Sequence, residues 1–335
     1  MKNNLVNFQI SERNDENMSK KSQMKVNDLI PLWLNNLEVS VKPSTFSTYQ
    51  VILKNHIIGT IGKLKIEELN KQAIDQFIIQ QYNNGRADGA GGLSAKTILN
   101  ISTILTSILK FAYENKYVQF YPFSPVKPRQ DMREIEILTQ TEQRHLEEYI
   151  YNHLDYKIVG ILLCLYTGIR IGELCALRVN DIDLENGILK INKSMQRIKN
   201  IDQNSANKTK IIIDTPKSGK PRYIPLPTAI VDILISLYKE SSPDCYILSG
   251  NHRYIEPRSY TNIFKKCLIE CNIREINFHA LRHTFATRCI EAEFDIKTLS
   301  EILGHSDVRI TLSTYVHSSY HLKCKYMKSL KLMCG

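Results

Sequence analysis

Basic side chains that suit phosphate chemistry are grouped in the stretch HALRHTF, residues 279–285. His279 and Arg282 are three residues apart, a spacing that places both on one face of a helix. Two donors arranged in this way can converge on one phosphate group, although an isolated HxxR is more often part of a surface helix that forms salt bridges. His283 completes an HxxxH spacing, but the glutamate of the metalloprotease pattern is missing, so we expect no metal site there.

Two further candidates lie earlier in the chain. Arg170 follows the glycine of TGIRIGELCAL, with Glu173 three residues later, which on its own is typical of a capping pair at a helix end. Lys217 lies in TPKSGKP, a stretch that predicts the tip of a β-hairpin. A lysine at a hairpin tip is ordinarily solvated, but the same position suits insertion into a DNA groove.

Carboxylates and cysteines give little sign of a cofactor. Asp181 and Asp183 are too few for a two-metal nuclease, which gathers several carboxylates, and NDIDLEN is typical of a turn. The sequence contains no phosphate-binding glycine-rich loop and no dinucleotide motif. Its eight cysteines form no CxxC pair, which favours a reduced, cytoplasmic protein. We therefore expect neither a metal nor another cofactor.

The charge of the chain favours a polyanionic partner. The 335 residues carry a formal net charge of +10, and nucleic acid is the first candidate for such a partner. No apolar run approaches the ~18 residues of a transmembrane helix, so we expect no membrane partner. The polar N-terminal segment lacks the apolar core of a secretory signal.

Hydrophobic periodicity predicts an all-helical first domain over residues 24–118. Its last helix is expected to start at Ser94 as N-cap and to bury one apolar stripe. The stripe comprises Ile98, Ile101, Leu105, Ile108 and Leu109. Three prolines in QFYPFSPVKPRQ then mark a linker at residues 119–137, because proline breaks helices and stiffens an extended chain.

A second, mixed domain is expected over residues 138–318. Thr139 and Glu142 form a capping box that starts its first helix. Two stretches in its middle alternate like strands, and the remainder has helical periodicity. The expected fold class is mainly α with a small antiparallel β-sheet. Residues 1–23 are expected to be flexible, and residues 319–335 form a C-terminal tail.

Taken together, the order and spacing of these residues resemble the tyrosine recombinase (phage integrase) family, most closely the integrases of conjugative transposons or prophages. The residues that match its motifs are Arg170, Lys217, His279, Arg282, His305 and Tyr315. The stretches TGIRIGELCALR, HALRHTFAT and LGHSD carry the likeness over residues 139–318, and it extends more loosely to 24–118. The resemblance implies a helical, SAM-like core-binding domain followed by a mixed α+β catalytic domain.

The resemblance also implies a reaction, a metal-free transesterification in which a tyrosine attacks DNA phosphorus and forms a 3′-phosphotyrosine. Arg170, Arg282 and His305 would contact the non-bridging phosphate oxygens. Lys217 would protonate the leaving 5′-oxygen, although Lys210 and Lys220 flank it. His279 would be either a phosphate contact or the base toward the tyrosine, and Glu173 would orient Arg170 or a histidine.

Family spacing selects Tyr315, ten residues after His305, over Tyr320 and Tyr326. Whether this tyrosine serves its own active site or a neighbour's stays open at this stage. The role of residues 193–209, longer than a simple hairpin needs, also stays open between an extended loop and an extra hairpin that enters DNA. Few residues precede position 24, so an arm-binding domain is either absent or truncated.

The implied partners are double-stranded DNA with inverted core sites and three further copies of the chain, a tetramer on two duplexes. Accessory DNA-bending or excision factors are also implied, and the protein would act in the cytoplasm at the nucleoid. In the first domain, Ser44, Thr45 and Lys96 are expected to contact the DNA backbone because they lie at helix starts. The tail is expected to dock on a neighbouring protomer.

Three alternative functions share these residues in whole or in part. A chromosome-dimer resolvase and a type IB topoisomerase would use the same active site in a different assembly. A DNA-binding regulator with an inactive catalytic domain is disfavoured because all six motif positions are occupied.

Overall fold

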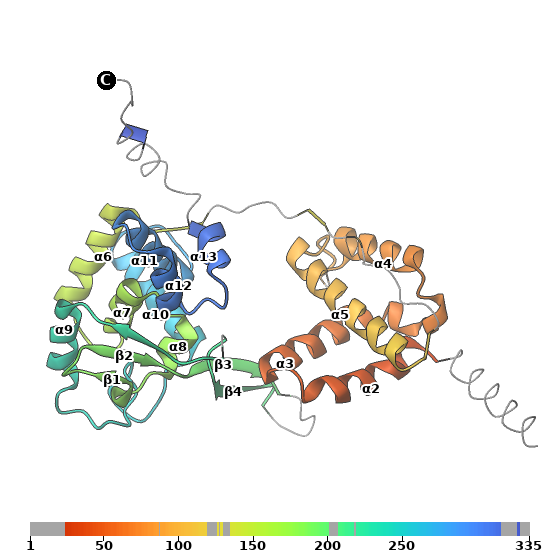
Figure 1. Ribbon diagram of the computed structural model, residues 1–335, viewed down its shortest axis with the longest axis horizontal. Coiled ribbons are helices and arrows are strands. Elements are labelled where there is room, and N and C mark those ends of the chain that lie inside the picture. Colours follow the sequence, from red (N-terminus) through yellow and green to blue (C-terminus); the bar gives the residue numbers. More distant parts are fainter. Residues whose placement is uncertain are drawn as a thin grey trace, which may run out of the picture. The chain divides into compact units, whose positions relative to one another are not determined.

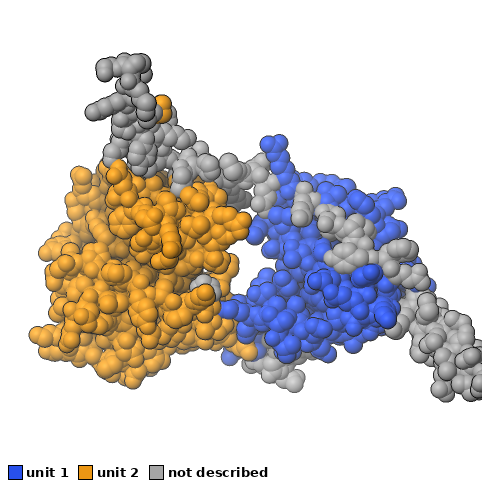
Figure 2. All heavy atoms as spheres, viewed as in Figure 1, with its two compact units in different colours: residues 1–132, 198–208 blue, residues 133–197, 209–335 orange. Residues whose placement is uncertain are grey.

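The computed structural model describes residues 24–86, 88–118, 126, 128–129, 135–200, 207–217, 219–315 and 327–328. The chain divides into two compact units (Figure 2). Unit 1 comprises residues 1–132 and 198–208, and unit 2 comprises residues 133–197 and 209–335. The predicted flexible N-terminus, nearly all of the proline-rich linker before residue 135 and nearly all of the C-terminal tail lie outside the described residues.

Within residues 24–118, unit 1 forms helices. Its helices are α2 (Val26–Glu38), α3 (Pro43–Ile52), α4 (Lys71–Asn84) and α5 (Ala95–Glu114), with a π-helical turn at Leu53–Ile57 and 3-10 turns at Ile61–Lys63 and Ile66–Glu68. The predicted N-cap is confirmed, since Ser94 Oγ accepts from the Thr97 amide at 3.2 Å. The predicted apolar stripe of α5 is buried, and it packs against α2 and α4.

One helix of unit 1 starts later than its hydrophobic pattern suggests. Residues 66–84 predict a single helix, but a 3-10 turn covers Ile66–Glu68 and α4 begins at Lys71. Asn70 is the reason, because its side chain accepts the Ala73 amide at 2.9 Å and so caps the helix at that point.

Unit 2 contains the remaining helices. They are α6 (Gln140–Asn152), α7 (Val159–Thr167), α8 (Ile171–Ala176), α9 (Thr228–Tyr238), α10 (Pro257–Glu270), α11 (His279–Glu291), α12 (Ile296–Leu303) and α13 (Val308–Tyr315). The capping box at the start of α6 is confirmed by reciprocal hydrogen bonds between Thr139 and Glu142. Helix α7 is buried along nearly its whole length and packs against α11 (Figure 1).

Two small sheets accompany these helices. An antiparallel three-stranded sheet has the order β1 (Ile182–Asp183), β2 (Ile188–Ile191), β5 (Arg222–Pro225), and Ile191 pairs with Arg222 at its end. A two-stranded sheet pairs β3 (Ser194–Lys199) with β4 (Thr209–Asp214). The fold class is therefore confirmed as mainly α with small β-sheets. Among the described residues, no helix is long and apolar enough to cross a membrane.

The position predicted for the hairpin tip is wrong. β2 pairs with β5 and β3 pairs with β4, so the outgoing strands β2 and β3 run beside the returning strands β4 and β5. The chain reverses between β3 and β4, where the Asn200 amide donates to the Lys208 carbonyl at 2.9 Å. Lys217 and Gly219 instead lie between β4 and β5, where the Gly219 amide donates to the Pro216 carbonyl at 2.9 Å. The long segment 193–209 thus supplies an extra hairpin, which is one of the two forms left open by its sequence.

Candidate active site

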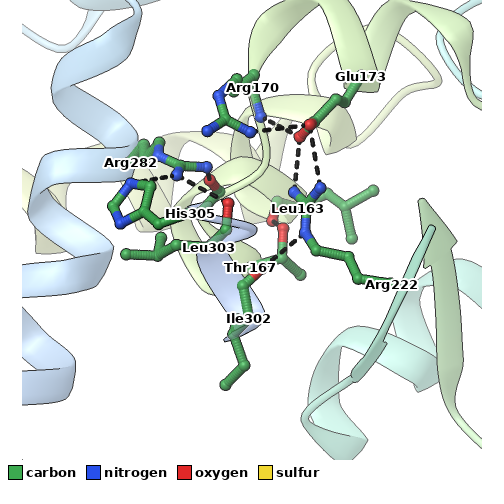
Figure 3. Close-up of polar contacts among 10 residues, drawn as sticks. Leu163, Thr167, Arg170, Glu173, Arg222, Arg282, Ile302, Leu303 and His305 are labelled. Atoms are coloured by element: carbon green, nitrogen blue, oxygen red, sulfur yellow. Dashed lines mark hydrogen bonds and ion pairs between the residues drawn. The ribbon is translucent and has the colours of Figure 1, made fainter. Parts of the chain in front are cut away.

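Arg282 is the most deeply buried cation of the predicted site. It lies on α11 with 2% of its surface exposed. Its Nη1 donates to the carbonyl oxygen of Gly168 at 2.7 Å, and its Nη2 donates to that of Leu303 at 2.8 Å (Figure 3). Gly168 ends α7 with φ 64°, in the left-handed region that favours glycine. The ends of α7 and α12 therefore fix the orientation of this guanidinium.

His305 contacts the same guanidinium. Its Nε2 lies 2.9 Å from Arg282 Nη2, and its Nδ1 lies 2.8 Å from the hydroxyl of Thr311. Because an arginine can only donate, Nε2 accepts and the ring proton is on Nδ1, directed at Thr311. Burial, followed by the charges of Arg282 and Arg170, lowers the pKa of His305 to about 4. The neutral ring would contact a phosphate only by exchanging one of these partners.

Glu173 is the anion at the centre of the arginine cluster. It is 1% exposed, and its Oε1 accepts from Arg170 Nη1 and Arg222 Nη1, both at 3.0 Å. Its Oε2 accepts from Arg222 Nη2 at 2.7 Å and from the Arg170 amide at 2.9 Å. Burial alone would raise the pKa of this carboxyl, but hydrogen bonds and charge from Arg222 and Arg170 outweigh it and lower the pKa below its usual range. The prediction of a capping pair is confirmed, because Glu173 accepts the Arg170 amide at the start of α8.

Arg222 is a member of the cluster that the sequence did not reveal. Besides its two bonds to Glu173, its Nε donates to the Ile302 carbonyl at 2.8 Å, which connects β5 to the end of α12 (Figure 3). Gly304 lies against it, and a Cβ there would stand 3.0 Å from Arg222 Cδ. The alternation of residues along the strand indicates that Arg222 is buried, because it lies on the same face of β5 as the buried Ile224. A core-facing arginine requires a carboxylate partner.

Tyr315 ends α13 with 2% of its surface exposed. Its ring packs in a small apolar cluster with α11 and α12, whose buried members include Ala286, Cys289, Ile290, Leu299 and Leu303. Its hydroxyl lies 2.9 Å from Nδ1 of His283. Burial raises the pKa of Tyr315, while the charge and a hydrogen bond of Arg282, and the charge of Arg170, act in the opposite direction. The side chain is therefore both packed and placed among cations of its own unit.

His279 lies at the edge of this group. Its ring meets that of His283 edge to face, with centroids 4.6 Å apart and planes at 84°. Partial burial, followed by the charges of His283, Arg282 and Arg170, lowers the pKa of His279 to about 4, although the residue keeps an exposed surface. His279 is thus neutral near pH 7 and accessible to a ligand.

Four predicted residues are not brought into the cluster. Lys217 is exposed in the turn after β4, where the Gly219 amide donates to the Pro216 carbonyl, and no described hydrogen bond or ion pair joins it to the arginines. Ser44 and Thr45 lie in the first turn of α3, and Lys96 in the first turn of α5, all in unit 1.

The acidic stretch near β1 serves the fold. Asp181 Oδ2 forms an ion pair with Lys193 Nζ at 2.8 Å, and Asp183 Oδ1 accepts the amides of Glu185 and Asn186. The prediction of a turn is confirmed. Within the part of the chain that the structure describes, no group of three or more His, Cys, Asp or Glu residues is arranged to hold a metal ion.

The first prediction concerns Arg222. Substitution Arg222→Met leaves Glu173 buried with one arginine fewer, and we expect it to lower the free energy of unfolding by ~3–5 kcal/mol. Urea unfolding followed by circular dichroism measures the change. The control is Arg309→Met, which removes an exposed ion pair with Asp307 and is expected to cost less than ~1 kcal/mol. Equal losses in the two variants would contradict a buried clamp on Glu173.

Two family models match the chain. The phage integrase family model matches residues 133–321, and the model of the phage integrase N-terminal SAM-like domain matches residues 25–80. The first match covers more than half of the 335 residues.

Individual relatives and solved structures agree with these matches. The chain is 28% identical over 317 residues to a XerC-like tyrosine recombinase of Caldanaerobacter subterraneus, covering 87% of this chain and 78% of the relative. It is 24% identical to tyrosine recombinase XerD of Staphylococcus saprophyticus, covering 84% and 90% of the two chains.

The Tn1549 transposon integrase bound to transposon end DNA superposes with a TM-score of 0.71 at 22% identity, covering 91% and 99%. A lambda integrase tetramer on a Holliday junction gives 0.62 at 17%, covering 85% and 79%. At these identities the two structures support the fold alone. The chain belongs to the phage integrase family and is a tyrosine recombinase, an enzyme that breaks and rejoins DNA strands.

Proposed function

We propose that the chain is a site-specific integrase in which Tyr315 attacks a DNA phosphodiester and forms a 3′-phosphotyrosine without a metal. The observation that carries the proposal is the buried hydroxyl of Tyr315, 2.9 Å from His283 and hydrogen-bonded to Arg282. A tyrosine that only packs does not need its hydroxyl beside a guanidinium and an imidazole. A free tyrosine, with pKa about 10, is a weak nucleophile near pH 7 and requires such neighbours.

The arginines supply the charge that a phosphoryl transition state needs. Arg170 and Arg222 pair with the carboxylate of Glu173, and Arg282 adds a third positive charge, so these four side chains have a net charge of +2 (3 − 1). Arg170 keeps 26% of its side chain exposed, which leaves donors for a phosphate oxygen. Each such donor, held in place before DNA arrives, is worth roughly 10²–10³ in rate. In this proposal His279 and His305 add contacts to the same phosphate.

The leaving 5′-oxygen requires a proton, and Lys217 is the proposed donor. Its exposed position in the turn after β4 supports this role, since an approaching DNA strand can meet it without rearrangement of the core. The DNA backbone would in turn bring Lys217 to the phosphate held by Arg170 and Arg282. Positioned general acids typically contribute about 10²–10⁴ in rate.

The biological setting is proposed from the chain's structural relatives. The Tn1549 and lambda integrases were solved on DNA, the latter also as a tetramer on a Holliday junction. We extend this to a tetramer of the present chain that joins two duplexes with inverted core sites, as the integrase of a mobile element acting in the cytoplasm at the nucleoid. Residues 24–118 would hold the core site with Ser44, Thr45 and Lys96 at the backbone, and the tail would dock on a neighbouring protomer.

The covalent intermediate gives the direct test. A duplex nicked next to the cleavage site releases a short fragment and traps the enzyme, so wild type should form a covalent DNA adduct in the presence of EDTA. Tyr315→Phe should form none, since no nucleophilic oxygen remains, while Tyr320→Phe and Tyr326→Phe should behave as wild type. Denaturing gels measure the adduct. An adduct on Tyr315→Phe would refute the proposal, and loss of the wild-type adduct in EDTA would require a metal.

The role of Lys217 is separable from that of the arginines. Lys217→Ala should slow cleavage of an ordinary nicked substrate by about 10²–10⁴. A substrate with sulfur in place of the 5′-oxygen should restore the rate, because a thiolate leaves without a proton. Lys210→Ala and Lys220→Ala are the matched controls and should need no such rescue. Rescue of either control instead of Lys217→Ala would reassign the general acid.

Delivery of the tyrosine within its own chain gives a further prediction. Tyr315 packs on α11 and α12 of the chain that carries Arg282, so cleavage should occur in cis. A mixture of Tyr315→Phe and Arg170→Ala proteins should then form no adduct above the level of either alone. Mixing each with wild type confirms that protomers assemble together. Restored adduct in the double mixture would show exchange of the tyrosine between protomers.

A further inference from the structure

The histidine in contact with the nucleophile is His283, to which the family motif residues assign no role. Its Nδ1 lies 2.9 Å from the Tyr315 hydroxyl, and the two ring centroids are 5.6 Å apart. His279, the motif histidine, lies one helical turn earlier on α11, and its ring packs edge to face with the ring of His283. His283 therefore stands between the motif histidine and the tyrosine.

The hydrogen bonds of Tyr315 allow its phenolic proton to point at His283. Arg282 hydrogen-bonds to Tyr315, and a guanidinium can only donate, so the phenolic oxygen is the acceptor of that bond. In the tautomer of His283 that carries its ring hydrogen on Nε2, Nδ1 accepts the O–H of Tyr315. This is the arrangement that a general base requires, with the heavy atoms within about 2.6–3.2 Å.

The surroundings keep His283 able to accept a proton. The charged or titratable groups near it are Arg282 and His279 on its own helix and Tyr315 on α13, while Arg170, at the start of α8, acts on His279 and Tyr315. Burial, followed by the charge of Arg282, lowers the pKa of His283. The ring is therefore neutral near pH 7, and its environment disfavours a permanent positive charge.

We propose that His283 is the general base that takes the proton of Tyr315 during strand cleavage. The Tyr315 O–H bond breaks and the proton moves to Nδ1, while the phenolic oxygen uses its electron pair to form the bond to phosphorus. The P–O5′ bond breaks, and the 5′-oxygen leaves with that pair and receives a proton from the general acid. In rejoining, the imidazolium of His283 returns its proton to the departing phenolate.

Rejoining also follows from this assignment. The 5′-hydroxyl of the incoming strand loses its proton to the conjugate base of the general acid and attacks phosphorus. The P–O bond to Tyr315 breaks at the same time. His283 is thus a base in cleavage and an acid in rejoining, and the net proton count over a full cycle is zero. The inference rests on the proposed function of Tyr315 and names the partner of its proton.

The test uses full-length protein and the nicked substrate with sulfur at the 5′ position, which makes proton donation to the leaving group unnecessary. His283→Gln keeps a polar side chain beside the hydroxyl but cannot take its proton. We expect His283→Gln and His283→Ala to slow adduct formation equally, by about 10²–10⁴, with no rescue by the sulfur substrate. Lys217→Ala is the contrasting variant, because the same substrate should rescue it.

The pH profile supplies the second readout. With the sulfur substrate, the wild-type rate should fall as the pH drops through the pKa of His283, because a protonated imidazole cannot accept. His283→Gln should lose this fall, and His279→Gln should retain it. The inference would be overturned if His283→Gln formed the adduct at a rate within about threefold of wild type. It would also be overturned if His279→Gln, rather than His283→Gln, abolished the fall in rate at low pH. If wild type itself forms no adduct, the proposed function fails instead.

Discussion

The guanidinium of Arg282 is held by two main-chain carbonyl groups at the ends of separate helices, and the neighbouring site residues are arranged around it. Gly168 contributes one carbonyl from the end of α7, and Leu303 contributes the other from the end of α12. These contacts bring the start of α8, with Arg170, and His305, two residues after the end of α12, to one place. Helix ends have carbonyls without partners in the helix, so a buried arginine both satisfies them and gains a fixed orientation.

The cluster of Arg170, Arg222, Arg282 and Glu173 carries an excess of positive charge. Glu173 neutralises part of the charge of Arg170 and Arg222, but Arg282 has no carboxylate among its described contacts and its pKa is lowered to about 10 by burial and by Arg170. The same positive surroundings help to keep His279 and His305 neutral. In the proposed function a phosphodiester supplies the missing negative charge, so binding of DNA would relieve the repulsion among these cations.

The sequence predicted much of this arrangement, and the misses have identifiable causes. Helix periods and caps such as Ser94 and Thr139 were readable because their hydrogen bonds are local. Arg282, His305 and Tyr315 were found through motif spacing. Arg222 was missed because its partner Glu173 is forty-nine residues away in the sequence. The hairpin tip was misplaced because the pairing of strands depends on residues that are distant in the sequence. His283 was weighed only as a metal ligand, since its contact with Tyr315 depends on how α13 packs.

The apolar setting of the Tyr315 ring has a consequence for control of the enzyme. Because the ring belongs to the cluster that binds α13 to α11 and α12, docking of this eight-residue helix also places the Tyr315 hydroxyl, the proposed nucleophile, beside its cations. Any local unfolding that lifts α13 removes the hydroxyl from the cations and leaves the rest of unit 2 folded. With Tyr315 as the proposed nucleophile, the fraction of molecules able to cut DNA would depend on this small hydrophobic contact, and a partner that competes for it would act as an off-switch.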